Sequence, residues 1–380
     1  MKTNKEGIPS QKFNHATTVT SYDNDINSVK YVEAPVEISE GLQLEPERDT
    51  PNRRRYVLTD IKCGIYNRRG LLYILLSSLF FALLGVFVQL STAIHEMEEG
   101  FVRGLFLSFF SVFGIIMGNT KLVLSKRQYF WITVNGCLNA FAQIGMFAAY
   151  NLTSVGDATA VMYSMPAFSG VMAWIFLKEP LTLLDVIFTV LCIIGVFLLS
   201  KPAFIFGSGK DEESDSNFLG TMWALAVLIS LSSACIVTRK LRQQSVSESC
   251  DSLILTLVHG VLVTITCAIL NTLIGEWCVP IDVTQLCYAL GIGLSGFFGI
   301  YLYCLSLKTE KALVVSVVFT TSIFMAYIFQ FAIFHDYPDL ISGLGIIVIL
   351  LSVFGVLMTD WRKDSKLTQS YATVEQSTIS

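Results

Sequence analysis

The sequence predicts an all-α integral membrane protein with ten transmembrane helices. Hydrophobic residues make up 53% of the chain and charged residues only 15%, and the mean hydropathy is +0.60. These values lie outside the usual range of soluble globular domains. The apolar residues gather in runs of about 20, the length that a helix needs to cross the hydrocarbon core of a bilayer. Because the runs are continuous and do not alternate with polar residues, helices are favoured over a closed barrel.

Polar segments flank and separate these apolar runs. Residues 1–69 are predicted to form a disordered cytosolic tail, and they contain no apolar h-region, so no cleavable signal peptide is expected. The polar residues 359–380 are predicted to form a second cytosolic tail. Between the tails lie ten predicted spans, at residues 71–90, 100–118, 129–149, 155–177, 182–200, 218–238, 253–273, 286–305, 311–333 and 339–358.

The basic residues predict the orientation of the chain. With both termini in the cytosol, the cytosolic segments near the spans carry 18 lysines and arginines, whereas the outer loops carry two, Lys201 and Lys210. Such an excess on the cytosolic side is typical of membrane proteins. Removing one span would destroy the bias, so it supports both the orientation and the count of ten.

A polar linker divides the spans five and five. Residues 201–217 contain an acidic run at 211–213 and are typical of a flexible, solvated segment. They separate a first unit, residues 70–200, from a second unit, residues 218–358. Because five is an odd number, the second unit enters the membrane from the opposite side. The units are therefore predicted to form an inverted repeat, as in many secondary transporters.

Short matches between the two units support this repeat. Each unit has a tight corner with an acid and a proline, Glu179-Pro180 after the fourth span and Asp336 to Pro338 after the ninth. A Gly-Val pair follows in the last span of each unit, beginning at Gly195 and at Gly355. The spacing from acid to glycine is not the same in the two units.

Arg103 is the main candidate for binding a solute. It is the only basic residue inside a predicted span far from the cytosolic side, and a charge at the bilayer centre costs roughly 2.5–3.5 kcal/mol. A guanidinium there can bind a carboxylate or phosphate through two parallel hydrogen bonds. Two alternatives stay open: Arg103 extends to the outer headgroups, or it is neutralised by Glu99, four residues earlier on the same helix face.

A stripe of amides marks the third span. Asn135, Asn139 and Gln143 are spaced by four residues and therefore lie on one helix face. Each amide needs hydrogen-bond partners, which lipid does not offer. The stripe therefore faces either a water-filled cavity or another helix to which it is hydrogen-bonded.

Further polar residues inside the spans are candidates for lining the same cavity. Pro166 removes a helical hydrogen bond and is expected to kink the fourth span, either as part of a gate or as a tolerated kink. His259 is either a proton carrier or a structural hydrogen-bonding residue. The remaining candidates are Tyr163, Ser164, Tyr301, Thr320, Thr321 and Gln330.

Cysteine and histidine give no indication of a metal or a cofactor. The nine cysteines lie mostly inside spans, where cysteine behaves as a small apolar residue, so no disulfide framework is expected. The four histidines have no paired ligand spacing, and no metal site is predicted. Neither a cofactor nor a nucleic-acid partner is expected.

One block of the sequence resembles a known family. Residues 156–159 read GDAT, residues 165–168 read MPAF, residues 173–180 read AWIFLKEP and residues 201–207 read KPAFIFG. This block resembles the first EamA-type unit of the drug/metabolite transporter superfamily, and specifically the G subfamily of solute carrier family 35. The second unit is similar in its TEKA motif, which begins at Thr309.

The resemblance implies a fold and a place for the candidates. It implies ten helices in two inverted five-helix EamA-type repeats, with spans 1–4 and 6–9 around a central cavity. Spans 5 and 10 would lie at the periphery, where some relatives form homodimers. Glu99 with Arg103 resembles the acid-to-arginine pattern of the family's second span. The second unit departs from the first, because Thr320 stands where the first unit has Pro166.

We therefore expect a secondary carrier that moves a small polar, anionic metabolite across the bilayer by alternating access. No GxxxxGK[ST] motif occurs, which excludes ATP-driven pumping, and no paired catalytic carboxylates or metal cluster in the spans indicate an enzyme. Two alternatives stay open: a nucleotide-sugar antiporter of the secretory pathway, which would need a larger cationic site, and a non-transporting scaffold. The C-terminal sequence has no dilysine or KDEL-type signal, which favours the plasma membrane over the endoplasmic reticulum or Golgi.

Overall fold

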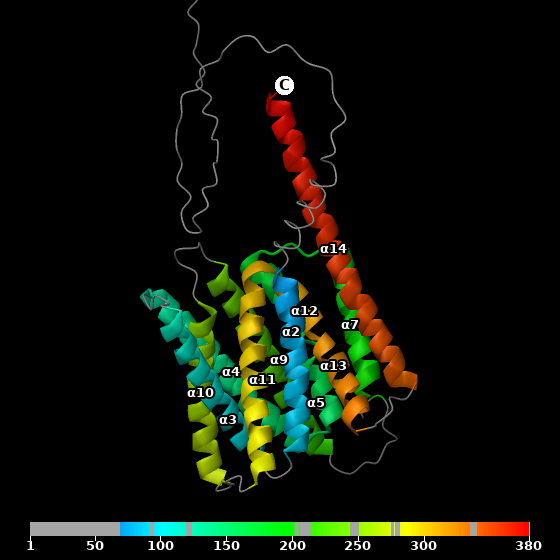
Figure 1. Cartoon of the computed structure of the whole chain (residues 1–380). Helices are drawn as coiled ribbons and strands as arrows, with labels where there is room; N and C mark the ends of the chain where they lie inside the picture. Colours follow the sequence, from blue (N-terminus) through cyan, green and yellow to red (C-terminus); the bar gives the residue numbers. More distant parts are fainter. Residues whose placement is uncertain are drawn as a thin grey trace, which may run out of the picture. The chain divides into compact units, whose positions relative to one another are not determined.

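The structure, a computed structural model, describes residues 69–91, 95–118, 124–201, 205, 214–243, 251–274, 277, 282–334 and 340–379. Within these ranges the ordered elements are all helices (Figure 1). They provide ten spans long and apolar enough to cross a membrane, so the predicted ten-span fold is confirmed. The predicted N-terminal tail and most of the linker 201–217 lie outside the described residues.

Eight spans are single helices, and two are series of shorter ones. The single helices are α2 Arg69–Leu90, α3 Glu96–Met117, α4 Lys126–Leu152, α7 Leu183–Ser200, α9 Ser214–Arg242, α10 Ser252–Ile274, α11 Val283–Thr309 and α14 Leu340–Ile379. The fourth span consists of α5 Val155–Met162, α6 Met165–Met172 and the π-helical turn η1 Ala173–Leu177. The ninth consists of α12 Ala312–Phe319, α13 Thr321–Phe329 and the π-helical turn η2 Gln330–Phe334. α14 thus continues as a helix through the polar C-terminal segment.

Local sequence explains where several helices begin and end. α4 begins at Lys126 because Ser125 and Gln128 form a capping box, in which the Ser125 N–H donates to Gln128 Oε1 at 2.8 Å. The Gln128 N–H donates in return to Ser125 Oγ at 3.3 Å. η1 and α7 end just before Lys178 and Lys201, whose φ angles of 57° and 46° are left-handed and stop a helix.

From the third span of each half onward, the helices of the two halves repeat at an interval of 156 or 157 residues. α4 begins at Lys126 and α11 at Val283, which is 157 residues later (283 − 126 = 157). The same interval separates the starts of α5 and α12, of η1 and η2, and of α7 and α14. This register pairs Gly195 with Ser352, so the two Gly-Val pairs noted in the sequence are not equivalent positions. Since each half has five spans, equivalent helices run in opposite directions and the repeat is inverted.

Both halves break their fourth span at the same register. α5 ends at Met162 and α12 at Phe319, again 157 residues apart (319 − 162 = 157). In the first half the break lies just before Pro166, which cannot donate a backbone hydrogen bond. In the second half the break falls at Thr320, whose hydroxyl donates to the carbonyl oxygen of Val317 at 2.6 Å and so competes with the helical pattern. The second break therefore forms without a proline.

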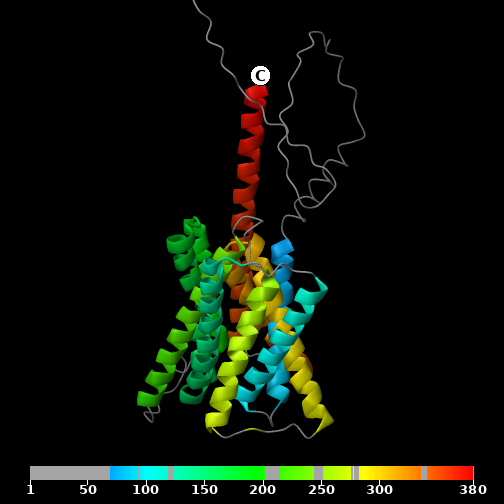
Figure 2. The same cartoon turned by 90° about the vertical axis from the view of Figure 1, so that its left-hand side faces the viewer.

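The helices of the two halves interleave. α2 packs on α11, and their repeat counterparts α9 and α4 pack on each other. α3 packs on its own counterpart α10, and α7 packs on its counterpart α14. Both views show helices of the first half, coloured blue to green, between helices of the second half, coloured yellow-green to red (Figures 1 and 2). If every helix is replaced by its counterpart in the other half, the same set of contacts results.

Glycines permit the closest contacts between counterpart helices. A Cβ atom on Gly104 of α3 would lie 2.8 Å from the backbone nitrogen of Thr264 and 2.9 Å from the carbonyl oxygen of Gly260 on α10. A Cβ atom on Gly195 of α7 would lie 3.1 Å from the carbonyl oxygen of Gly345 on α14. Small residues at such crossings let helix backbones approach in lipid. Backbone-to-backbone packing therefore holds both counterpart pairs together.

Candidate functional site

A cavity of about 260 Å³ lies between the two halves. Helices α2 to α6 and α9 to α12 contribute to its wall, together with Thr320 at the break of the ninth span. In the described part of the chain, no group of three or more His, Cys, Asp or Glu side chains could hold a metal ion. The polar residues that line the cavity are Arg103, Asn135, Asn139, Gln143, Tyr150, Tyr163, Thr238, His259, Tyr303, Ser316 and Thr320.

The amides of α4 contribute both to helix packing and to the cavity wall. Asn135 is 3% exposed, and its Oδ1 accepts a hydrogen bond from Oγ1 of Thr238 on α9 at 3.3 Å. Asn139 Nδ2 donates to the carbonyl oxygen of Asn135 at 2.8 Å. Asn139 and Gln143 are half-buried, and all three amides lie at the cavity wall. The stripe thus joins α4 to α9 through Asn135 and presents polar atoms to the cavity.

Arg103 reaches the cavity from α3. Its Nη2 donates a hydrogen bond to Oε1 of Gln143, whereas its buried Nε has no hydrogen-bond partner among the described residues. Its stem passes over α11 where Gly296 leaves room, since a Cβ atom there would lie 2.6 Å from Cγ of Arg103. Glu99 and His259 lie within electrostatic reach of the guanidinium. A guanidinium with an unused donor beside a cavity is suited to binding an oxyanion.

Four aromatic rings form a second part of the wall. Phe319 lies at their centre: the Tyr163 ring is nearly parallel to it at 6.3 Å between centroids, and Phe81 meets it edge-on at 5.1 Å. Tyr303 also approaches Phe319 edge-on, at 5.7 Å. All four side chains are half-buried and line the cavity. Since Tyr163 and Phe319 lie at the two helix breaks, the breaks present aromatic rings to the cavity.

The two broken spans contact each other through hydroxyl groups. Ser169 Oγ on α6 donates to Ser316 Oγ on α12 at 2.7 Å. The hydroxyls of Tyr163 and Ser322 lie 3.4 Å apart. These hydroxyl contacts therefore connect the fourth and ninth spans where they cross.

A buried ion pair ties the spans together at the end of the bundle where α2 begins, here called the tail-side end. Arg239 of α9 donates from Nε to Oε1 of Glu179 at 2.9 Å, and from Nη1 to the carbonyl oxygen of Leu307 at 2.9 Å. Glu179, in the corner after η1, also accepts a hydrogen bond from the N–H of Ala312 at 3.1 Å. The two charged side chains are only 7% and 11% exposed. This Glu179–Arg239 bridge joins the fourth span to α9, α11 and α12.

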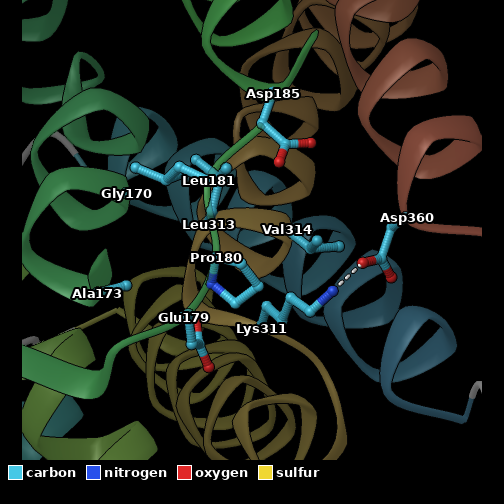
Figure 3. A pocket seen from close by; sticks show the side chains of 10 residues that line it. All are labelled: Gly170, Ala173, Glu179, Pro180, Leu181, Asp185, Lys311, Leu313, Val314 and Asp360. Carbon is cyan, nitrogen blue, oxygen red and sulfur yellow. Dashed lines mark hydrogen bonds and ion pairs between the residues drawn. The ribbon is translucent and has the colours of Figure 1, made fainter. Parts of the chain in front are cut away.

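A second ion pair lies beside the bridge. Lys311 Nζ, just before α12, lies 2.6 Å from Oδ1 of Asp360 on α14. Figure 3 shows this pair next to the corner around Pro180, where the surrounding residues enclose a crevice of about 10 Å³. The tail-side end therefore carries two ion pairs that both involve the start of the ninth span.

The Glu179–Arg239 bridge lies next to the cavity along three helices. The cavity-lining residues Cys235, Tyr303 and Ser316 are each four residues, about one turn, from a residue that takes part in the bridge. Those bridge residues are Arg239, Leu307 and Ala312, respectively. The bridge therefore lies about one turn beyond the cavity wall.

Eight of the residues singled out in the sequence line the cavity: Arg103, Asn135, Asn139, Gln143, Tyr163, Pro166, His259 and Thr320. Glu99, Ser164, Tyr301, Thr321 and Gln330 are not among the described lining residues. Two of these five have hydroxyls bonded within their own spans, Ser164 to the carbonyl oxygen of Ala160 at 3.0 Å and Thr321 to that of Val318 at 2.7 Å. Tyr301 stacks on Phe297 at 5.7 Å, and Gln330 begins η2.

Sequence reasoning did not single out several lining residues. Thr238, Ser316 and Tyr303 line the cavity, as do the rings of Phe81 and Phe319. A hydroxyl or a ring in a span is common, so composition alone gives no signal for them. Helical spacing could identify them only if, on each helix, one residue that faces the cavity were already known.

Comparison with known proteins agrees with this architecture. The EamA-like transporter family matches the chain twice, at residues 68–201 and 218–358. Solute carrier family 35 member G1 is similar over 300 residues, with 29% identity for the Homo sapiens protein and 30% for the Mus musculus protein. The match covers 78% of this chain and 81% and 80% of those two proteins.

A solved crystal structure shares the fold. It superposes with a TM-score of 0.66 at 12% sequence identity, and the match covers 77% of this chain and 99% of that chain. The two family matches coincide with the two halves that repeat at an interval of 157 residues. The chain therefore belongs to the EamA-like transporter family, and within it resembles the G subfamily of solute carrier family 35.

Proposed function

We propose that this protein is a secondary carrier that moves a small organic anion across a membrane by alternating access, with the cavity as its binding site. Membership of a transporter family supports movement of a small solute. The observation that supports an anionic solute is Arg103, whose buried Nε has no hydrogen-bond partner among the described residues. A buried donor without a partner costs about 1–3 kcal/mol. A carboxylate or phosphate oxygen bound there would offset that cost.

Three features support alternating access. The repeat is inverted, which gives a carrier two related arrangements of the same helices. Each half breaks its fourth span at the cavity, so the parts on either side of the break can tilt separately. The Glu179–Arg239 bridge ties four spans together at the tail-side end, about one turn from the cavity wall. In the proposed cycle the bridge parts when the cavity opens to that side, which the basic residues predict to be the cytosol.

The cavity favours this function over a nucleotide-sugar antiporter. Among the described lining residues, Arg103 is the only Lys or Arg. A nucleoside diphosphate carries more than one negative charge, and each needs a cation or several donors when water is excluded. A single guanidinium is better matched to one carboxylate. The scaffold alternative finds no comparable support in the described residues.

Uptake into proteoliposomes tests the proposal. The purified full chain is reconstituted and offered radiolabelled carboxylates, nucleotide sugars, amino acids and organic cations, with protein-free liposomes as the blank. We expect saturable uptake of a carboxylate that Arg103→Gln reduces at least about tenfold, the scale of one charge-assisted hydrogen bond. Arg103→Lys should keep part of the activity, because it retains the charge but not the planar donor pair.

The matched control is Arg127→Gln, which removes an arginine from an exposed position at the start of α4. It should leave uptake unchanged. Uptake of an anion that is equally fast in wild type and Arg103→Gln would refute the role of Arg103. A folded, reconstituted protein that moves no member of the panel would refute the carrier proposal.

A further inference from the structure

One wall of the cavity runs along α11, where two glycines let side chains of the first half lie against the helix. Arg103 passes over Gly296, and Phe81 lies over Gly299, where a Cβ atom would come within 3.1 Å of the ring. Tyr303 follows one turn later on the same wall. Along the helix axis, Gly299 lies about 4.5 Å and Tyr303 about 10.5 Å from Gly296. The guanidinium and the rings therefore lie within the length of one small molecule.

The rings offer apolar faces to whatever fills the cavity. Phe81, Tyr163, Tyr303 and Phe319 are only half-buried although they lie inside the bundle, so part of each ring borders the cavity and not another side chain. The contacts among them converge on Phe319. Aromatic rings in this arrangement bind a further flat ring by stacking or edge-to-face contact.

The hydroxyls near the rings are already hydrogen-bonded within the protein. Ser316 Oγ donates to the carbonyl oxygen of Ala312 at 2.8 Å and accepts from Ser169 Oγ at 2.7 Å. Thr320 Oγ1 donates to the carbonyl oxygen of Val317 at 2.6 Å. A sugar or another polyol would bring hydroxyls that lose water and find few new partners there, which is costly. This end of the cavity therefore favours an apolar group.

The charges of the site match one negative group on the solute. Arg103 is the only Lys or Arg among the described lining residues. Glu99, which is 8% exposed and one turn earlier on α3, offsets part of its charge. A second carboxylate on the solute would meet no further Lys or Arg in this wall, and Glu99 would repel it. The cavity, at about 260 Å³, is also smaller than the roughly 300–1,000 Å³ of drug-sized sites.

Resting on the proposed function, we infer that the transported anion is a monoanion with a flat apolar body, such as a one-ring aromatic carboxylate. Its carboxylate binds Nε of Arg103, the donor without a partner among the described residues, beside Gln143. Its ring lies along α11 against Phe81 and Phe319. Saturated, polyhydroxylated and dianionic solutes of the same size are selected against by the rings, the satisfied hydroxyls and Glu99, respectively.

Equilibrium binding to the purified full chain tests this selectivity. Radiolabelled 3-phenylpropionate is bound in a scintillation-proximity format and competed with three unlabelled acids. These are 3-phenylpropionate itself, 3-cyclohexylpropionate, which has a puckered saturated ring, and phenylsuccinate, which has a second carboxylate. We expect the latter two to compete about tenfold more weakly than the first.

Two phenylalanine variants separate the ring contact from general packing. Phe319→Leu should shrink the preference for the phenyl over the cyclohexyl acid to about twofold. Phe109→Leu makes the same change on α3 at a side chain that is 65% exposed on the outside of the bundle, and it should keep the full preference. Arg103→Gln should abolish binding of both acids.

The outcomes distinguish this inference from the proposed function. If the phenyl and cyclohexyl acids compete equally and neither binds to Arg103→Gln, the requirement for a flat ring is refuted. The proposal of an anion carrier then stands. If phenylsuccinate binds more tightly than 3-phenylpropionate, the inference that the solute is a monoanion is refuted. Absence of phenylpropionate binding, alongside Arg103-dependent uptake of another anion, would overturn the whole inference. If anion binding and uptake are the same in Arg103→Gln as in the wild type, the proposed function itself is refuted.

Discussion

At the scale of single residues, the site depends on how Arg103 is shared between the protein and a solute. Gln143 holds one arm of the guanidinium through Nη2, and Gly296 gives the stem its path across α11. The Nε donor has no protein partner among the described residues. The protein thus orients the guanidinium with a neutral amide, which leaves its charge available.

A carboxylate in place of that amide should block the site. Gln143→Glu keeps the size of the side chain and its hydrogen bond to Arg103 but adds a negative charge, which would form a permanent ion pair in a low-dielectric site. We expect anion uptake to fall at least about tenfold with the protein still folded. Gln89→Glu, the same change at an exposed position of α2, should have no effect. Undiminished uptake by Gln143→Glu would show that the solute does not use this guanidinium.

The sequence predicted the chemistry of the site better than its geometry. Arg103 and the amide stripe of α4 were found because charged and amide groups are costly in lipid and must face a cavity or a partner. Tyr301 was chosen where Tyr303 lines the cavity, because two residues on a helix are 200° apart and the sequence does not fix which face points inward. The rings of Phe81 and Phe319 gave no signal, since phenylalanine is equally at home against lipid.

At the scale of elements, the ends of the spans were predicted to within a few residues, but the break in the ninth span was not. Apolar length determines a span, and α4, α9, α11 and α14 extend further because their helices continue into polar residues. A proline marks the break in the fourth span. No proline marks the break at Thr320, where the hydroxyl bonds to the Val317 carbonyl oxygen and lies 3.3 Å from Cys192 Sγ of α7. A threonine in a span is common, so it alone does not predict a break.

The Glu179–Arg239 bridge should control access from the tail-side end. Removing one partner of a buried pair leaves an uncompensated charge, so Glu179→Gln should loosen the closure. In a variant whose only cysteine is Cys235, a membrane-impermeant maleimide added on that side should label the cavity several-fold faster than without the substitution. Lys308→Gln, a change at an exposed neighbour, should leave the labelling rate unaltered.

Reversing the charges gives a second measure of the bridge. Glu179→Arg and Arg239→Glu should each abolish uptake, and the double variant should recover part of it. Recovery stays partial because the exchange does not restore the hydrogen bonds to Ala312 and Leu307. Single reversals that transport like the wild type would show that the bridge has no part in the cycle.

The glycine crossing of α3 and α10 should be intolerant of even one methyl group. Gly104→Ala places a Cβ atom against the backbone of α10, and overpacking of this kind costs about 1–3 kcal/mol. We expect a lower melting temperature for the detergent-solubilised protein. Gly85→Ala is the matched control, because nothing lies within 4 Å of its added Cβ. Equal melting temperatures for the two variants would contradict the tight crossing.

At the scale of the whole molecule, the odd number of spans per half has a testable consequence for orientation. Both termini are predicted to face the cytosol and the linker 201–217 the opposite side. Epitope tags at either terminus should therefore be hidden from antibody in intact cells and detected only after permeabilisation. A tag inserted in the linker should be detected in both conditions wherever the protein reaches the cell surface. A terminal tag detected without permeabilisation would reverse the predicted orientation.

The interleaving of the halves also bears on how the protein is made. A ribosome synthesises the first five spans before the second five exist, yet α2, α3 and α4 pack mainly against helices of the second half, above all α11, α10 and α9, respectively. During that interval the newborn half displays a guanidinium and a row of amides that its final neighbours will later cover. We therefore expect membrane chaperones to bind the first half until the second half is made, and proteases to degrade it if the second half is missing. If the two halves are produced as separate chains, divided in the linker, each should be degraded when produced alone. Produced together, both should be stabilised, because each half supplies the helices against which the other packs.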